Sequence, residues 1–263
     1  MLSLAQVVAK HDGVAPLNEA TTMAIETSSP LRVSIFDEVV AAAAVGDAPV
    51  EFMVHPRYRR QGRGTALLQE LLAQGERSFW AHGDLPGAQQ LARNLGLTAV
   101  RSLLKLRLEQ ASEIPAATPA NVLIRSFRDD DIEQILAINK EAFREHPEQG
   151  AMDRADFDNR RAQDWFDPEG LFVAERDDEV LGFHWTKLED SIGEVYVVGV
   201  DPRAHGSGIG KALTARGLEY LWDSGVKAID LYVESNNTPA LAVYQGLGFV
   251  ENARDVLYQK TDG

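Results

Sequence analysis

Cysteine is absent from this sequence of 263 residues, which excludes disulfides, thiolate metal sites and a cysteine nucleophile. Long apolar runs are also absent, since none approaches the roughly 18 residues that a membrane-spanning helix needs. The first residues, MLSLAQVVAKHDGVAPL, contain no basic segment followed by an apolar one, so they do not resemble a secretory signal. We therefore expect a cytoplasmic globular protein with no membrane partner.

Basic residues are scarce relative to acidic ones: 26 Lys and Arg stand against 40 Asp and Glu, for a net charge of −14. Nucleic-acid binding is not expected, because it depends on a basic surface that displaces the counterions of the phosphates. The charge instead favours small-molecule or cationic substrates. With 44% hydrophobic residues, the chain can bury the core of one large domain or of two small ones.

One segment, 109–121, is rich in Ala, Pro, Ser and Thr and lacks a helix or strand periodicity, which is typical of a linker. LLKLRLE before it is expected to close one sheet, and VLIRSF after it is expected to open another. We therefore predict an N-terminal domain over 1–110, a linker over 111–120 and a C-terminal domain over 121–263.

The same succession of strand, glycine-rich loop, helix, strand and short helix occurs once in each half. PVEFMVHP corresponds to GEVYVVGV, and PGAQQLARNLGL corresponds to NTPALAVYQGLGF. The corresponding glycines are 146 residues apart at the loop (Gly64 and Gly210) and 152 apart at the end of the short helix (Gly96 and Gly248). This pattern predicts a duplication in which each half is an α/β domain with a mixed α+β sheet.

The glycine-rich loops stand directly before helices, where open backbone N–H groups and the helix dipole favour a phosphate or pyrophosphate. A P-loop is excluded in the second half, because Lys211 is followed by Ala212 and His205 stands where the first glycine is required. The GSGIG stretch also lacks the spacing of a dinucleotide fingerprint. A third pattern, basic or Gln followed by x-x-Gly-x-Gly/Ala, is met in full by RRQGRG at 59–64, and HGSGIG at 205–210 has its glycines.

This third pattern resembles motif A of the GCN5-related N-acetyltransferases (GNAT), and Asn236-Asn237 followed by PALAVYQGLGF resembles the later signature of that family. The resemblance covers most of the chain as two tandem GNAT domains, and it implies acetyl-CoA as cosubstrate and no metal. It places acetyl-CoA in the second half on Val198, Gly199, Val200, His205, Gly206, Ser207, Gly208, Ile209, Gly210, Lys211, Asn237, Thr238, Pro239, Ala240, Leu241 and Ala242. The corresponding positions in the first half are Phe52, Met53, Val54, Arg60, Gln61, Gly62, Arg63, Gly64 and Thr65.

The loop of the second half departs from the family pattern, because His205-Gly206-Ser207 stands where a basic cluster is usual. The pyrophosphate is therefore expected to rest more on backbone amides and less on cationic side chains.

A closer resemblance, to tandem GNAT members that acetylate the cysteinyl amine of a glucosaminyl-inositol precursor, lies outside motif A. It rests on DGVAPLNE, FWAHG, HPEQG, WFDPEGLF, LGFHWTK, GEVYVVGVDP and LYVESNN, which span both halves. HPEQG and GFHWTK have no role in general coenzyme binding and are the specific part of the match. The resemblance implies that this substrate, Cys-GlcN-Ins, contacts Glu19, Glu148, Lys187, Glu194 and Tyr232. We expect a monomer.

The two halves differ in the residues that could transfer protons. Glu194 opens the strand before the second loop, and Ala48 is its counterpart 146 residues earlier. Tyr244 stands in the short helix of the second half, and Ala92 is its counterpart 152 residues earlier. The resemblance assigns Glu194 as general base, acting through water, and Tyr244 as general acid toward the coenzyme A thiolate. We therefore predict that the second half is catalytic and the first half is catalytically degenerate.

Two alternatives share part of this pattern. An acetyltransferase of another amine would have the same catalytic core, and it is favoured if Glu19, Glu148 and Lys187 are remote from the acetyl site. A coenzyme-binding sensor would have the loops without catalysis, and Glu194 and Tyr244 argue against it. An acetyl-transfer assay separates the two.

Overall fold

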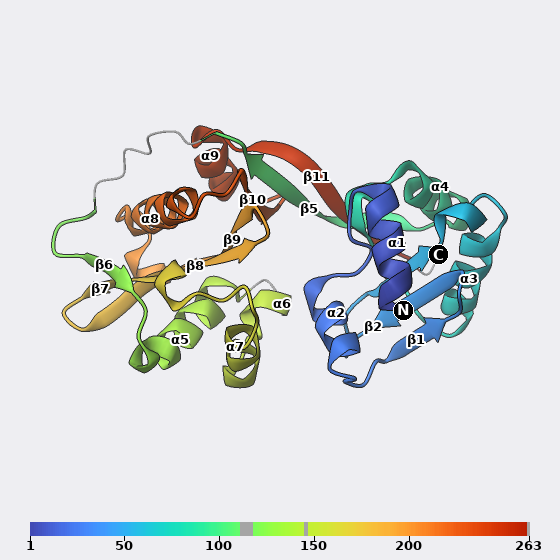
Figure 1. The fold of residues 1–263 in the computed structure, drawn as a ribbon, viewed down its shortest axis with the longest axis horizontal. Coiled ribbons are helices and arrows are strands. Elements are labelled where there is room, and N and C mark those ends of the chain that lie inside the picture. Colours follow the sequence, from blue (N-terminus) through green and yellow to red (C-terminus); the bar gives the residue numbers. More distant parts are fainter. Residues whose placement is uncertain (111–117, 145–146, 262–263) are drawn as a thin grey trace. The chain divides into compact units, whose positions relative to one another are not determined.

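The computed structural model describes residues 1–110, 118–144 and 147–261, with the backbone alone at 147 and 148. The chain forms two compact units, which are traced from blue to red in Figure 1. Unit 1 comprises Met1–Leu104, Glu234–Asn236 and Ala253–Gly263, and unit 2 comprises Lys105–Val233 and Asn237–Asn252. The predicted linker lies outside the described residues over 111–117, and residues 118–120 contain no helix or strand.

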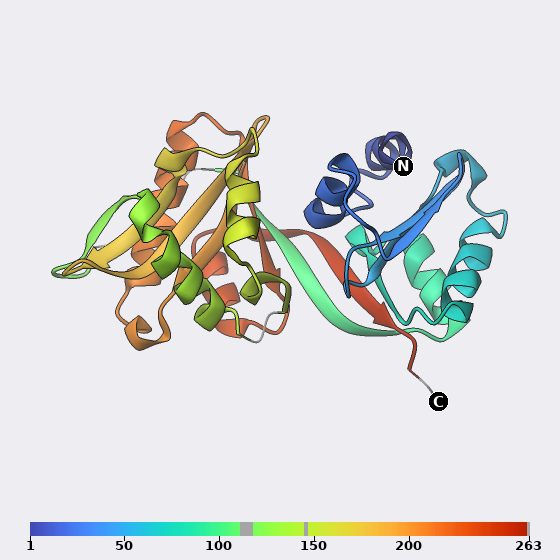
Figure 2. The same cartoon turned by 90° about the horizontal axis from the view of Figure 1, so that it is seen from below.

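Unit 1 is a mixed sheet between two pairs of helices (Figures 1 and 2). Its strand order is β1-β2-β3-β4-β11, with β4 parallel to β3 and antiparallel to β11. Its elements are α1 (Leu2–Asp12), α2 (Glu19–Glu26), β1 (Val33–Phe36), β2 (Val40–Ala44), β3 (Val50–Val54), α3 (Arg63–Ala73), β4 (Ser78–Ala81), α4 (Pro86–Leu95), most of β5 (Thr98–Leu108) and most of β11 (Val250–Gln259).

The alanines of β2 show why both faces of this sheet can be covered. Ala42 and Ala44 pack in one core cluster with Leu67, Leu68 and Leu71 of α3. Ala41 and Ala43 pack on the other face in a cluster with Leu4 and Val8 of α1. A strand buried on both faces has no polar alternation, and its small side chains allow the helices to approach closely.

Unit 2 has the strand order β5-β10-β9-β8-β7-β6. Ile209 and Leu213 of α8 pack in one cluster with Phe172 of β7, whereas Ile135 of α5 and Phe157 of α7 belong to another. Its elements are the end of β5, β6 (Leu123–Ser126), α5 (Ile132–Ala142), α6 (Pro147–Gly150), α7 (Arg154–Arg161), β7 (Leu171–Arg176), β8 (Glu179–Glu189), β9 (Ile192–Val200), α8 (Ile209–Asp223), β10 (Ala228–Glu234), α9 (Thr238–Gly246) and the start of β11.

Local turn chemistry explains two of the element boundaries in unit 2. The β7–β8 hairpin turns at Asp177 and Asp178, whose φ angles of 51° and 64° suit a two-residue turn of the kind that Asp tolerates. Helix α8 ends at Asp223, and Gly225 follows it with a φ of 81°, in the left-handed region that favours glycine. The predicted α/β class is confirmed, because the sheet of each unit contains parallel and antiparallel strand pairs and is packed against helices.

Candidate active site

The glycine-rich loop of unit 2 connects β9 to α8. Gly206 and Gly208 have φ angles of 75° and 86°, so the loop requires glycine at both positions. Gly208 is the N-cap residue of α8, and the first N–H groups of a helix have no partner within it. Together with the helix dipole, these groups form a site for an anion. The ring of His205 is directed back to the strand, with Nε2 3.1 Å from the carbonyl oxygen of Val200.

The loop of unit 1 repeats this geometry, because Gly62 is the N-cap residue of α3 with a φ of 81°. Arg59, the first residue of its motif, is already paired: Nη1 and Nη2 each donate to the Asp12 carboxylate at 2.7 Å. Its Nε also donates to the carbonyl oxygen of Val54 at 3.0 Å. The guanidinium of Arg59 therefore already has hydrogen-bond partners within the protein, namely Asp12 and the carbonyl oxygen of Val54.

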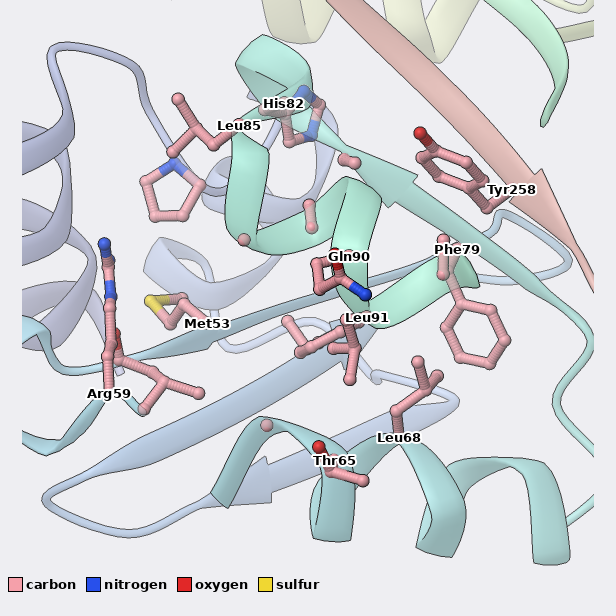
Figure 3. Close-up of a pocket in the computed structure, with 18 of the residues that line it drawn as sticks. Met53, Arg59, Thr65, Leu68, Phe79, His82, Leu85, Gln90, Leu91 and Tyr258 are labelled. Carbon is pink, nitrogen blue, oxygen red and sulfur yellow. The ribbon is translucent and has the colours of Figure 1, made fainter. Parts of the chain in front are cut away.

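A cavity of about 330 Å³ adjoins the unit 1 loop, and Figure 3 shows Met53, Arg59, Thr65, Leu91 and Tyr258 around it. Eight of the nine residues predicted to hold acetyl-CoA in the first half line this cavity: Phe52, Met53, Val54, Arg60, Gly62, Arg63, Gly64 and Thr65. The ninth, Gln61, is not among the lining residues, and its Nε2 donates to the carbonyl oxygen of Arg57 at 3.3 Å.

In unit 2 the strands on either side of the glycine loop separate. The parallel ladder between β9 and β10 runs from the pair Ile192–Ala228 to the pair Val195–Leu231, although β9 continues to Val200. Beyond Val195, the edge of β9 that faces β10 is left without ladder partners in the described part of the chain. Backbone N–H groups on such an edge can polarise a carbonyl group placed between the two strands.

A β-bulge adds to this opening. The register of β8 with β9 shifts so that Thr186 pairs with Val195 and Trp185 pairs with Val197, which leaves Tyr196 as the extra residue. The bulge lies just before the stretch 198–200, which the family resemblance assigns to acetyl-CoA.

A row of charged residues crosses three neighbouring strands of unit 2. Glu194 on β9 is in register with Lys187 on β8 and with Asp230 on β10. A Cβ on Gly193 would lie 2.9 Å from the side chain of Leu221 in α8, so Gly193 faces α8 and Glu194 faces the opposite side of the sheet. Side chains in register share a face, so the predicted residues Lys187 and Glu194 are brought together.

Two cationic side chains contact the carboxylate of Asp230. Arg107 donates to it through Nε at 2.6 Å and Nη2 at 2.8 Å, and Nζ of Lys105 lies 3.0 Å from Oδ2. Burial alone would raise the pKa of Asp230, but Arg107 and Lys105 hold it below its usual value. None of these three residues is predicted from the sequence, because no local pattern relates β5 to β10.

Three of the predicted substrate residues lie outside this row. Tyr232 is 43% exposed, and Nζ of Lys105 lies over its ring at 5.4 Å from the centroid. Glu19 is the first residue of α2 in unit 1, where the side chain of Asn18 caps the helix by accepting from the N–H of Thr21. Glu148 lies on α6, and its side chain is outside the described residues.

Tyr244 lies on α9, and its ring packs against the ring of Phe249 with the centroids 5.8 Å apart. Burial raises the pKa of Tyr244 to about 12, so the hydroxyl keeps its proton at neutral pH. The side chain of Asn237 accepts from the N–H of Ala240 at 3.2 Å and caps this helix. The N-cap role explains an asparagine at this position on structural grounds.

Within residues 1–110, 118–144 and 147–261, no three His, Cys, Asp or Glu residues are grouped in a way that could hold a metal ion. Nor does any helix within them combine the length and the apolar character that crossing a membrane requires.

The fold and its two glycine-rich loops define an acetyltransferase of the GNAT class. The Acetyltransferase (GNAT) family model matches residues 31–97 and 132–249. A GCN5-related N-acetyltransferase from Sphaerobacter thermophilus has a similar structure, with a TM-score of 0.70 at 21% identity over 98% of this chain and 91% of that chain. A tandem GNAT protein from the clavulanic acid biosynthesis pathway gives a TM-score of 0.62 at 20% identity over 85% and 79%. At these identities the likeness concerns the fold alone.

Within that class, the chain belongs to the family of the mycothiol acetyltransferases. It is 47% identical to the mycothiol acetyltransferase of Thermomonospora curvata over 98% of this chain and 92% of the relative. The relatives of Thermobispora bispora and of a Nocardioides species carry the same name, at 41% identity over 99% and 95% and at 42% over 97% and 94%. The protein is an acetyl-CoA-dependent N-acetyltransferase with two tandem GNAT-type domains. The closer of the two resemblances in its sequence, which is to mycothiol synthase, is confirmed.

Proposed function

We propose that the protein transfers the acetyl group of acetyl-CoA to the cysteinyl amine of Cys-GlcN-Ins, the last step of mycothiol biosynthesis. The observation that carries this proposal is the charged row in which Glu194 stands between Lys187 and Asp230, where the open edge of β9 begins. This row combines a carboxylate for an ammonium substrate with residues that can orient a polyhydroxylated one.

The proposed mechanism needs three actions from this chain. Glu194 takes a proton from the cysteinyl ammonium through a water molecule, so that the neutral amine can attack the thioester carbonyl. Backbone N–H groups of the stretch 198–200 polarise the carbonyl oxygen. Tyr244, which is protonated at neutral pH, donates a proton to the departing thiolate.

Acetyl-CoA is proposed to bind productively in unit 2, with its pyrophosphate at the start of α8 and its arm along α9. The glycines of the loop support this assignment, because their φ angles leave the backbone accessible. In unit 1 the cavity at the start of α3 supports a second coenzyme site. That site would be non-productive, because Ala48 and Ala92 stand at the positions that correspond to Glu194 and Tyr244.

For the substrate we propose contacts with Glu19, Glu148, Lys187, Glu194 and Tyr232. Carboxylates and a lysine suit an acceptor that carries an ammonium group and many hydroxyls. Glu19 would give the degenerate half a role in substrate binding. We further propose that the enzyme acts as a cytoplasmic monomer without a nucleic-acid partner. The net charge of −14 supports the last point, because binding to nucleic acid depends on a basic surface.

A coenzyme A release assay tests the proposed substrate. Cys-GlcN-Ins is compared with cysteine methyl ester, with an aminoglycoside and with a peptide N-terminus, each at saturating acetyl-CoA. We expect the highest kcat/KM for Cys-GlcN-Ins. A higher value for one of the other amines would reassign the substrate, and no release with any amine would favour a coenzyme-binding sensor.

A further inference from the structure

The buried carboxylate of Asp230 contacts two cationic side chains, Arg107 and Lys105. Its side chain is 4% exposed, and the two-pronged contact with Arg107 already engages both of its oxygens. A fork-to-fork pair of this kind satisfies the charge and the geometry of a carboxylate. Lys105 adds a second positive charge at 3.0 Å from Oδ2. Because it is costly to withdraw a charge from water, the ammonium of Lys105 is stabilised by a second contact partner.

Tyr232 is that other partner. The ammonium of Lys105 lies over the ring of Tyr232, 5.4 Å from its centroid, which is within the range of a cation–π contact. Burial alone would lower the pKa of Lys105, but its contacts with Tyr232 and Asp230 raise it, so the side chain is charged at neutral pH. Tyr232 is nevertheless 43% exposed, and this exposed part of its surface can contact a ligand.

The register places this pair on the face of the sheet that carries the proposed base. Asp230 pairs with Glu194 on the neighbouring strand, and Tyr232 follows Asp230 by two residues along β10, so the three side chains share a face. Neighbouring strands are about 4.8 Å apart. Lys105 is therefore held beside the position at which the acceptor amine is proposed to react.

We propose that Lys105 is a positioning residue of the acceptor site, which holds the Tyr232 ring in the orientation that binds the polyhydroxylated part of the substrate. This inference rests on the proposed function, which assigns Tyr232 to the substrate. Lys105 is fixed by Asp230 at one side and holds Tyr232 at the other. Without it, the half-exposed ring would sample other rotamers, and the acceptor would bind at an additional entropic cost.

Two matched variants separate this role from a structural one. Lys105→Met and Arg107→Gln each leave one cation on Asp230, but it is the ammonium of Lys105 that lies over the Tyr232 ring. We expect Lys105→Met to raise the KM for Cys-GlcN-Ins roughly 5- to 30-fold. The KM for acetyl-CoA and the kcat should change less than 2-fold, and Lys105→Arg should restore most of the affinity. Arg107→Gln should lower thermal stability without this selective change in KM.

A double-mutant cycle completes the test. If Lys105 acts through Tyr232, the variant that combines Lys105→Met with Tyr232→Leu should have the same acceptor KM as Tyr232→Leu alone. Multiplicative effects of the two substitutions, or equal effects of Lys105→Met and Arg107→Gln on the acceptor KM, would overturn the inference and leave the proposed function standing. An unchanged acceptor KM in Tyr232→Leu would remove Tyr232 from the proposed site, and the role of Lys105 would fall with it.

Discussion

Asp255 is bound to His82, which stands 173 residues earlier in the chain. Oδ2 of Asp255 lies 3.0 Å from Nδ1 of His82, and Oδ1 accepts from the N–H of Gly83 at 2.8 Å. On its other side, Nε2 of His82 contacts Oε1 of the fully buried Glu51 at 2.5 Å. The imidazole thus joins β3, the end of β4 and β11 within unit 1.

This arrangement predicts a loss of stability in alkaline solution. Burial alone would lower the pKa of His82, but Asp255 and Glu51 raise it from 6.5 to about 10. Because the folded-state pKa lies above the unfolded one, the stabilisation is complete below pH 6.5 and is lost as the pH rises toward 10. The loss should amount to about 2–5 kcal/mol. Urea unfolding at pH 6.5 and pH 9.5 measures it, with the double variant His82→Gln/Glu51→Gln as control, in which this part of the pH dependence should vanish.

The buried ring of His184 in unit 2 leads to the opposite prediction, a loss of stability in acidic solution. Its Nδ1–H donates to the carbonyl oxygen of Leu213 at 2.8 Å, and its Nε2 is buried with no hydrogen-bond partner among the described residues. Burial lowers the pKa of His184 from 6.5 to about 4, although the hydrogen bond to Leu213 partly opposes this. The folded state therefore holds the neutral ring, and this stabilisation is complete above pH 6.5 and lost as the pH falls toward 4. We expect a loss of about 3 kcal/mol, measured by urea unfolding at pH 7 and pH 4.5. The acid sensitivity of His184→Leu should be smaller by that amount, and an equal sensitivity would contradict the assignment.

The division of labour between the two loops predicts unequal effects of one substitution. Gly208→Asp introduces a side chain where φ is 86° and places a negative charge at the proposed pyrophosphate site, so turnover should fall by at least about 100-fold. Gly62→Asp makes the same change where φ is 81° in unit 1, and it should retain most of the activity. Steady-state kinetics on both variants provide the comparison. Equal losses would mean that the two sites are not functionally different.

Glu194→Gln should lower kcat far more than it weakens acetyl-CoA binding. Loss of a positioned general base typically costs about 10²–10⁴-fold in rate. The activity should recover in part at high pH, where more of the amine is already neutral. Stopped-flow kinetics from pH 6 to pH 10 and calorimetric titration with acetyl-CoA measure the two effects. Tyr244→Phe serves as comparison and should lose less, because a thiolate is a tolerable leaving group. An unchanged rate and pH profile in Glu194→Gln would exclude it as the base.

The sequence predicted those features that depend on neighbouring residues. The strand, glycine loop and helix of each motif are adjacent in the chain, so their order was legible in the glycines and in the apolar periodicity. Lys187 and Glu194 are also close in the chain, and the structure shows that they lie on the two strands of one hairpin and pair across it. The family resemblance supplied their proposed roles.

What only the tertiary structure decided was the pairing of distant strands. Arg107 meets Asp230 across 123 residues, and His82 meets Asp255 across 173. Strand LLKLRLE was expected to belong to the first half, yet Lys105 and Arg107 at its end lie in unit 2, while residue 255 at the other end of the chain lies in unit 1. Strand order depends on which hydrophobic faces the helices cover and on which edges remain to be paired, and neither is encoded within a local window of sequence. The sequence by itself therefore determined two tandem acetyltransferase motifs, and the packed sheet decided which charged groups surround the proposed base.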